Sequence, residues 1–129
     1  MRLLVDTQCW LWMAASPERL SSTARGIVED PANHLLLSSA SAWEIAIKYA
    51  LGKLQLPDAP ARYVPTRMVA LRTRALPIEH AHALGVSDLP PHHRDPFDRL
   101  LVSQALGEGI PLLTADPTFG RYGVSVVDA

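Results

Sequence analysis

Short apolar runs alternate along the chain with longer stretches in which apolar residues recur at helical spacing. The short runs predict five strands, over residues 2–6, 35–38, 75–78, 112–114 and 124–127. The stretches between them predict helices over residues 21–30, 40–51, 62–72, 79–85 and 97–106. Strands that alternate with helices indicate an α/β domain, with a mainly parallel sheet covered on both faces.

Glycine, proline and serine set the expected limits of the helices. Ser21 or Ser22 is expected to cap the first helix, and Gly52 to end the helix over 40–51. Because proline is disfavoured inside a helix, Pro65 predicts that the helix over 62–72 begins near that residue. Gly107 and Gly109 are expected to end the last helix. Within the helix over 40–51, apolar residues at helical spacing predict one apolar face, composed of Trp43, Ala46, Ile47, Ala50 and Leu51.

Length and composition limit the classes of protein to which this chain can belong. At 129 residues, the chain is expected to form a single domain over residues 1–129. No apolar run approaches the roughly 20 residues of a membrane span, and the first residues lack the pattern of a secretory signal, so we expect a cytoplasmic protein. The single cysteine, Cys9, excludes an internal disulfide and a cysteine zinc cluster, and a small buried residue is expected there.

The charge is nearly balanced overall but uneven along the chain. A net charge of −1 gives no general signal for nucleic-acid binding. Residues 59–78 nevertheless hold four arginines and no acid: Arg62, Arg67, Arg72 and Arg74. This cluster is either a solvated face or a rim that contacts phosphates.

Four acidic residues, each at the edge of an apolar run, carry the main chemical signal. They are Asp6 after the first strand, Glu44 in the helix after the second, Asp98 at the start of the last helix and Asp116 after the fourth strand. The carboxyl ends of parallel strands meet at the edge of a sheet where ligands bind. Carboxylates gathered there repel one another unless a cation joins them, and a hard cation such as Mg²⁺ suits an all-oxygen site. The chemistry that most often needs such a site is phosphate-ester cleavage.

Each acid taken alone also has a structural interpretation. Asp6 and Asp116 sit where they could cap a turn, and Asp98 where it could favour a helix dipole. Glu44 could close a capping box with Ser41, or form an i,i+4 ion pair with Lys48. It is the shared position of all four at one predicted edge that favours a functional site.

Neighbouring polar residues fit the same pattern. Thr7, Ser39 and Thr114 lie close to the acids in the sequence and could orient carboxylates, or could serve as caps. Asp95 is a further candidate that could instead orient the loop before Pro96. The five histidines do not have metal-ligand spacing, and His92 and His93, in a proline-rich loop, are expected at the surface.

Large apolar residues crowd a further, short helix that is expected at residues 10–13, before the helix over 21–30. Trp10, Leu11, Trp12 and Met13 are consecutive, and a helix turns fully in about 3.6 residues, so they cannot all face one core. We expect Trp10, Trp12 and Met13, joined by Trp43, to form a surface for a partner; the alternative is a helix wedged between the core and a loop.

Several motifs, in order along the whole chain, resemble those of PIN-domain ribonucleases, specifically the VapC-type toxins of bacterial toxin–antitoxin modules. The two specific motifs are Ser-Ala-Trp-Glu-Ile-Ala-Ile-Lys at 41–48 and Asp-Pro-Phe-Asp-Arg-Leu-Leu at 95–101. Weaker ones are Asp-Thr at 6–7, Leu-Trp at 11–12, Gly-Lys-Leu at 52–54, Leu-Pro-Ile at 76–78 and Leu-Thr-Ala-Asp at 113–116.

The resemblance implies a three-layer α/β/α PIN-like fold and a Mg²⁺-dependent endoribonuclease, with Mn²⁺ as a substitute ion. It implies that Asp6, Glu44, Asp98 and Asp116 bind the metal and that an activated water hydrolyses RNA. It also implies a homodimer held inactive by a cognate antitoxin, whose amphipathic segment would occupy the aromatic surface. Two alternatives stay open: a binding module that uses the acids structurally, and a nuclease of the same fold that acts on DNA.

Overall fold

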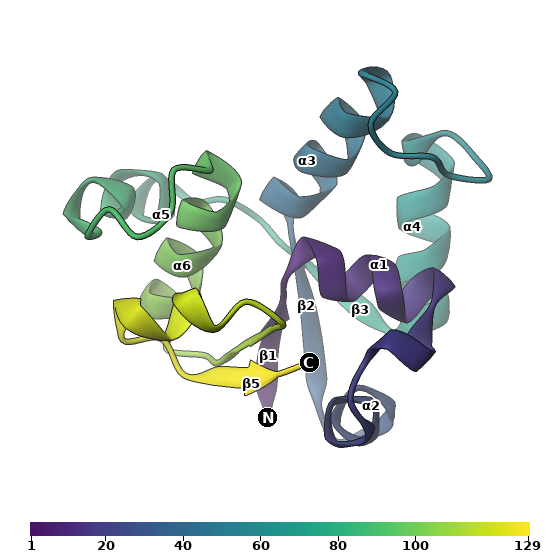
Figure 1. Cartoon of the computed structure of the whole chain (residues 1–129), viewed down its shortest axis with the longest axis horizontal. Coiled ribbons are helices and arrows are strands. Elements are labelled where there is room, and N and C mark those ends of the chain that lie inside the picture. Colours follow the sequence, from purple (N-terminus) through teal and green to yellow (C-terminus); the bar gives the residue numbers. More distant parts are fainter.

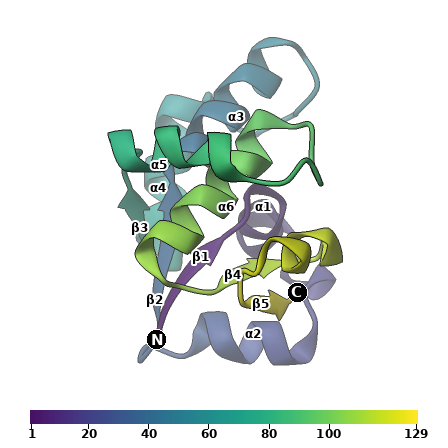
Figure 2. The same ribbon diagram turned by 90° about the vertical axis from the view of Figure 1, so that its left-hand side faces the viewer.

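A five-stranded, all-parallel sheet forms the centre of the molecule in the computed structural model, which describes residues 1–129. Its strands are β1 (Arg2–Val5), β2 (His34–Ser38), β3 (Thr73–Leu76), β4 (Leu112–Thr114) and β5 (Val126–Asp128). They lie in the order β3-β2-β1-β4-β5, which can be followed in Figures 1 and 2. The predicted α/β class and the five-stranded sheet are confirmed, with strand limits that differ by one or two residues.

The order of the strands creates a switch point beside β1. The chain adds β2 and β3 on one side of β1, then crosses over to add β4 and β5 on the other side. The segments that follow β1 and β4 therefore run to opposite faces of the sheet. The loops that begin these segments separate at the carboxyl ends of the two strands. Ligand sites of open α/β sheets lie at such points.

Two hydrophobic cores, one on each face of the sheet, hold the layers together. Alternate strand residues point to opposite faces, so Leu3 and Val5 enter one core and Leu4 enters the other. Helices α1 (Thr7–Ala15), α2 (Ser22–Glu29) and α4 (Pro60–Leu71) cover the first face. The second face is covered by α6 (Pro96–Glu108) and the 3₁₀ helix Pro117–Tyr122, with α5 (His80–Gly85) packed on α6. Figures 1 and 2 show these layers.

The remaining helix, α3 (Ser39–Ala50), begins directly at the end of β2 and contacts α1, α4 and α6. The Ser38 hydroxyl caps it by accepting a hydrogen bond from the Ala40 N–H at 2.9 Å. Ser41 is thus inside the helix, and the capping box of Ser41 with Glu44 is wrong. Short 3₁₀ helices at Pro17–Arg19 and Val86–Asp88 complete the chain. No helix combines the length and apolar character that crossing a membrane requires.

The apolar face predicted for α3 is not its buried face. Its buried residues are Ala40, Ser41, Glu44 and Ile45, whereas Trp43 is 58% exposed and Leu51, just after the helix, 63%. The helix is oriented by its start at the end of β2, which turns Glu44 inward and leaves much of the apolar stripe to solvent.

Two proline and glycine interpretations also need correction. Helix α4 begins at Pro60 and carries Pro65 inside it, so the predicted start near Pro65 is wrong. Pro60 suits the first turn, where its missing N–H is not needed, and Pro65 lies on the exposed side of the helix. Gly107 lies within α6, and Gly109 alone ends that helix, in a left-handed conformation with φ 64°.

Two of the four residues expected at a partner surface are in the core. Trp10 has no exposed area and Met13 is 7% exposed, so both assignments are wrong. The Trp10 Nε1 donates to the Thr73 hydroxyl at 3.2 Å, which satisfies the polar atom of the buried indole. Trp12 is half-buried beneath the Arg19 guanidinium, and Trp43 is exposed. The first helix is therefore wedged into the core on most of its sides.

Substitution of Trp10 and of Trp43 should change the free energy of unfolding by different amounts, because one side chain is in the core and the other is at the surface. We expect Trp10→Ala to lower the free energy of unfolding by about 3–5 kcal/mol, because it leaves a large cavity. Trp43→Ala should cost about 1 kcal/mol or less, because it removes only surface packing. Urea denaturation of both variants measures the difference, and equal losses would contradict the assignment of Trp10 to the core.

Candidate active site

An acidic cavity of about 330 Å³ opens at the carboxyl edge of the sheet. Four carboxylates line it: Asp6, Glu44, Asp95 and Asp98. Asp6 follows β1, Glu44 lies in α3, and the other two belong to the cap and first turn of α6. Thr7, Gln8, Lys48 and Lys53 also line the cavity. The fold thus brings together three of the four predicted acids and Asp95, the further candidate, from three separate parts of the chain.

Asp6 is held by the start of α1. Its side chain caps the helix, and Oδ1 accepts a hydrogen bond from the Cys9 N–H at 2.7 Å. Burial raises the pKa of this carboxyl; hydrogen bonds from Thr114 and Cys9 oppose the rise, and the charge of Glu44 adds to it. The capping role suggested by the sequence is therefore real, and it aims Asp6 at the cavity.

Glu44 is paired within its own helix. The side chain of Glu44 is 8% exposed, and its Oε2 lies 2.6 Å from the Lys48 Nζ, so the predicted i,i+4 pair is confirmed. The adjacent hydroxyl of Thr7 donates to the Ser41 hydroxyl at 2.8 Å. This hydrogen bond joins α1 to α3 and fixes the two helices that carry Asp6 and Glu44.

Asp98 experiences the strongest electrostatic stress in the cavity. Burial raises its pKa to about 6, and the charges of Asp95, Glu44 and Asp6 act in the same direction, against an opposing effect of His93. Asp95 caps α6 by accepting from the Phe97 N–H at 2.8 Å, which places its carboxyl one turn from Asp98. The carboxylates are thus close enough to repel one another.

Asp116 occupies a separate position at the end of β4. It does not line the cavity; its Oδ1 accepts from the Thr118 N–H at 2.9 Å, and its Oδ2 lies 2.8 Å from the His93 Nε2. Burial tends to raise the pKa of Asp116, but the hydrogen bonds from His93 and Thr118 outweigh it and lower the pKa. The cap role proposed for Asp116 is therefore also present.

His93 is a structural residue, although its place in a proline-rich loop predicted a surface position. Its side chain is only 10% exposed and stacks on Phe119, with ring centroids 4.6 Å apart. The Tyr122 hydroxyl lies 2.9 Å from His93 Nδ1. The expectation of a surface loop residue is wrong for His93, because aromatic residues nearly thirty positions later close over the loop, and local sequence carries no sign of that contact.

Thr114 and Ser39, two of the hydroxyl residues predicted near the acids, differ in burial and in hydrogen bonding. Thr114 is fully buried; its Oγ1 accepts from the Asp116 N–H at 3.0 Å, and its hydroxyl also lowers the pKa of Asp6. Ser39 is exposed at the start of α3. Its neighbour Ser38, which sequence reasoning missed, is fully buried and donates to the amide of Gln104 in α6.

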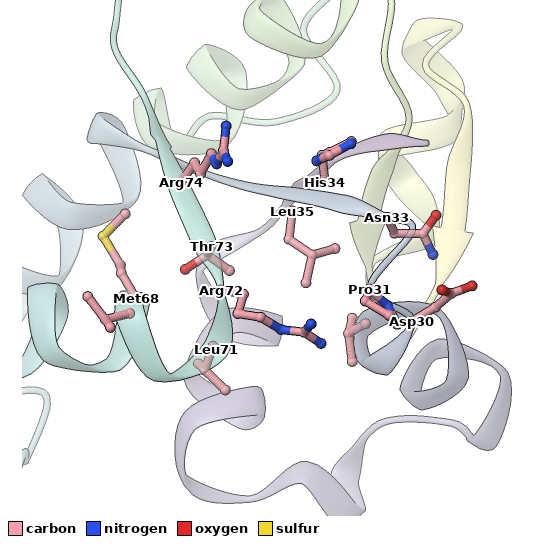
Figure 3. A pocket seen from close by; sticks show the side chains of 12 residues that line it. Asp30, Pro31, Asn33, His34, Leu35, Met68, Leu71, Arg72, Thr73 and Arg74 are labelled. Carbon is pink, nitrogen blue, oxygen red and sulfur yellow. The ribbon is translucent and has the colours of Figure 1, made fainter.

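The arginine-rich segment does not border the acidic cavity. Arg72 and Arg74 line a different cavity of about 350 Å³ at the amino end of β2 and β3 (Figure 3). Arg67 and Arg72 donate to the carbonyls of Ala14 and Glu29, at 2.9 Å and 3.3 Å. At least two of these arginines thus join α4 to other helices, and none forms a rim around the acids.

The donor set of the acidic cavity suits a hard divalent cation. All four carboxylates offer oxygen, the ligand that Mg²⁺ prefers. In the present side-chain arrangement no three acidic, histidine or cysteine groups surround a common ion position, and the ammonium of Lys48 is the cation in contact with them. The raised pKa values of Asp6 and Asp98 reflect burial and repulsion that a bound cation would relieve. The residues therefore fit Mg²⁺.

The fold and the cavity define a three-layer α/β/α domain with an acidic site at the switch point of a parallel sheet. The family model of the PIN domain matches residues 3–124, and the chain belongs to the PIN domain family. The predicted family and fold are thereby confirmed.

One curated relative matches part of the chain. Ribonuclease VapC16 of Mycobacterium tuberculosis (strain ATCC 25618 / H37Rv) is 57% identical over 58 residues, which make up 45% of this chain and 41% of the relative. The match thus spans less than half the length of that relative.

Several solved structures share the fold. VapBC2 from Rickettsia felis, bound to a DNA fragment from its promoter, gives a TM-score of 0.74 at 15% identity, over 99% of this chain and 98% of that chain. VapBC-1 from nontypeable Haemophilus influenzae gives 0.67 at 17% identity, with the same coverage. FitAcB from Neisseria gonorrhoeae gives 0.62 at 18% identity, over 98% and 96%. At these identities the likeness concerns the fold.

Removal of one carboxylate should stabilise the folded protein. The pKa of Asp98 is about 6 in the folded protein, against 3.8 for an unperturbed aspartate. The folded state therefore binds more protons between these pH values, and stability falls as the pH rises through them. In a buffer with a chelator at pH 7, we expect Asp98→Asn to raise the melting temperature by a few degrees, corresponding to about 1 kcal/mol.

The gain should vanish below about pH 3, where Asp98 is largely neutral in both the folded and the unfolded state. Asp58→Asn, at an exposed residue that makes no ion pair, is the control and should leave the melting temperature unchanged. Thermal denaturation of Asp98→Asn across this pH range measures the effect. A lower melting temperature for Asp98→Asn at pH 7 would contradict a repulsive cluster.

Proposed function

We propose that this protein is a Mg²⁺-dependent endoribonuclease that acts as the toxin of a toxin–antitoxin module. The observation that carries the proposal is the convergence of Asp6, Glu44 and Asp98 in one cavity at the switch point of a PIN fold. The partial match to a relative named as a ribonuclease supports the activity. The fold shared with toxin–antitoxin complexes is compatible with the module.

Roles follow from the position of each acid. Asp6 and Asp98 would hold the principal cation, because Asp6 is buried, Asp98 is half-buried and both carry raised pKa values. Glu44 would complete that site or position a water, and Asp116, outside the cavity, would orient the surroundings or serve a second cation. When bound, Mg²⁺ would supply a more acidic water and neutralise charge on a phosphate. Mn²⁺ would substitute for it.

The residues around the acids keep the geometry rigid. The Cys9 N–H fixes one oxygen of Asp6, and the Thr7–Ser41 hydrogen bond holds α1 against α3. The Cys9 thiol is not a nucleophile in this scheme, since burial raises its pKa well above its usual range. Attack of water on phosphorus, with the 3′ oxygen leaving, produces a 5′-phosphate and a 3′-hydroxyl.

Cleavage of RNA tests the activity. We expect the purified chain with Mg²⁺ to generate discrete new 5′-phosphate ends in total bacterial RNA, and EDTA to abolish them. Asp98→Asn should slow cleavage by roughly a hundredfold or more, because a bound cation contributes several kcal/mol to the transition state. Asp58→Asn is the matched control and should cleave normally.

Sequencing of the new RNA ends measures the outcome, with single-stranded DNA of the same sequence as a second substrate. A 2′,3′-cyclic phosphate product would contradict the water mechanism. Full activity of Asp98→Asn would contradict the assigned site. If the protein cleaves the DNA but not the RNA, its substrate is DNA and the proposed RNA substrate is wrong.

The proposed antitoxin needs an apolar surface to cover. Helices α3 and α4 enclose an apolar hollow of about 310 Å³. It is lined by Ala42, Ala46, Pro60, Ala61, Val64 and Pro65. Trp43, on the same helix α3, is exposed, and small residues in the hollow allow close approach of a helix. We therefore assign an amphipathic antitoxin segment to this hollow, in place of Trp10 and Met13. A cytoplasmic homodimer remains part of the proposal.

A charge in the hollow should weaken antitoxin binding. We expect Ala46→Glu to raise the dissociation constant for the cognate antitoxin by roughly tenfold or more, because it buries an unpaired carboxylate. Ala81→Glu, at an exposed alanine of α5, is the control. Calorimetric titration measures the affinity, and sedimentation measures the oligomeric state. If Ala46→Glu binds the antitoxin with unchanged affinity, the hollow is not the antitoxin site. If Ala46→Glu instead converts a dimer into monomers, the hollow is the contact with a second copy of this chain.

A further inference from the structure

Of the two lysines that line the acidic cavity, Lys48 is the one that forms an ion pair with an acid of the site. Its Nζ donates to Glu44 Oε2 at 2.6 Å, and its side chain also lines the cavity. The pKa of Lys48 is raised, chiefly by the hydrogen bond to Glu44, with smaller effects of Asp95 and Asp98. The ammonium is thus attracted by carboxylates from two helices, α3 and α6.

The two members of the pair differ sharply in exposure. The side chain of Glu44 is 8% exposed and that of Lys48 is 47% exposed. Glu44 is therefore fixed in the wall, whereas Lys48 reaches it from the solvent side on a flexible four-carbon stem. An ordinary i,i+4 ion pair on a helix surface stabilises the helix only slightly. Here the acidic member is buried, so the lysine mainly neutralises a charge inside a cavity.

The net charge of the cavity determines which side chains could bind a phosphate there. Four carboxylates and two ammonium groups line it, so its formal charge is negative. A nucleic-acid phosphate is also negative and needs cationic partners to enter. Lys53 lies at the exposed side of the cavity without an ion pair, whereas Lys48 already lies against the acids. Lys48 is therefore the side chain best placed to meet a phosphate beside the carboxylates.

We propose that Lys48 is a substrate-binding residue of the acidic site, which exchanges its ion pair with Glu44 for a phosphate of single-stranded RNA. This role rests on the proposed ribonuclease function. The exchange replaces one charge-assisted hydrogen bond, from Nζ to a carboxylate oxygen, by another, from Nζ to a phosphate oxygen. The carboxylate of Glu44 is released at the same time and becomes free to bind a cation. In the resting protein the same lysine keeps the buried Glu44 neutralised.

The dependence of RNA binding on salt tests this role. The probe is a fluorescein-labelled single-stranded RNA of mixed sequence, bound in Ca²⁺ in place of Mg²⁺ and followed by fluorescence anisotropy over a series of KCl concentrations. We expect Lys48→Gln to weaken binding by roughly tenfold and to reduce the slope of log K against log salt by about 0.7, the loss of one phosphate contact. Lys48→Arg should keep the slope, because it keeps the charge.

Control variants separate substrate contact from a structural role. Arg25→Gln, at an exposed arginine of α2 near the opposite edge of the sheet, should match the wild-type protein in affinity and slope. Glu44→Gln should strengthen RNA binding in EDTA, because it frees Lys48, and the double variant with Lys48→Gln should lose that gain. Melting temperatures monitor folding of every variant. The single variant Lys48→Gln leaves the buried Glu44 carboxylate unpaired and could unfold for that reason. The double variant removes this charge as well, so it allows the same test on a folded protein.

Two results would overturn the inference. One is a Lys48→Gln protein that is folded and binds RNA with the wild-type slope; if the wild-type protein still cleaves RNA, only the role of Lys48 fails. The other is a wild-type protein that does not bind the RNA, which would remove both this role and the proposed function.

Discussion

Repulsion among carboxylates held at one edge of the sheet is the constraint on which the site depends. Asp6, Asp95 and Asp98 each begin a helix or lie in its first turn, and Glu44 is turned inward by the start of α3. Asp6 and Asp95 cannot move away without loss of a helix cap. The raised pKa values of Asp6 and Asp98 are the electrostatic consequence, and Lys48 reduces the stress on one side of the cavity.

Buried polar contacts keep this stressed cluster in place. Ser38, at the end of β2, caps α3 and donates to Gln104 of α6. The Thr7 hydroxyl joins α1 to α3, and Thr114 joins β4 to both Asp6 and Asp116. Together these hydrogen bonds connect all the elements that carry acids. Their removal would allow the carboxylates to separate, so these buried hydrogen bonds help to hold the acidic residues together.

The strands and the acids could be predicted from sequence because both depend on local signals. A short apolar run such as Leu3–Val5 favours a buried strand, and an acid just beyond such a strand lies at the carboxyl edge of a parallel sheet. The orientation of α3 could not be predicted in this way. Its apolar stripe through Trp43 suggested a buried face, yet packing at the end of β2 turned Glu44 inward.

Contacts between distant segments account for the other errors. Trp10 is buried because Thr73, on a different strand, accepts its indole N–H, and His93 is buried because Phe119 and Tyr122 pack on it. Neither partner is visible near the residue in the sequence. The placement of Asp116 outside the cavity has the same origin, since His93 and Thr118 bind both of its oxygens.

The location of a divalent cation is the most direct test of the proposed site. Crystals grown with Mn²⁺ would reveal the ion by its anomalous scattering. A peak within coordination distance of both Asp6 and Asp98 is the expected result. Ordered, empty carboxylates in the cavity at saturating Mn²⁺, or a peak only at another place on the surface, would contradict a metal-dependent active site at the carboxyl edge of the sheet.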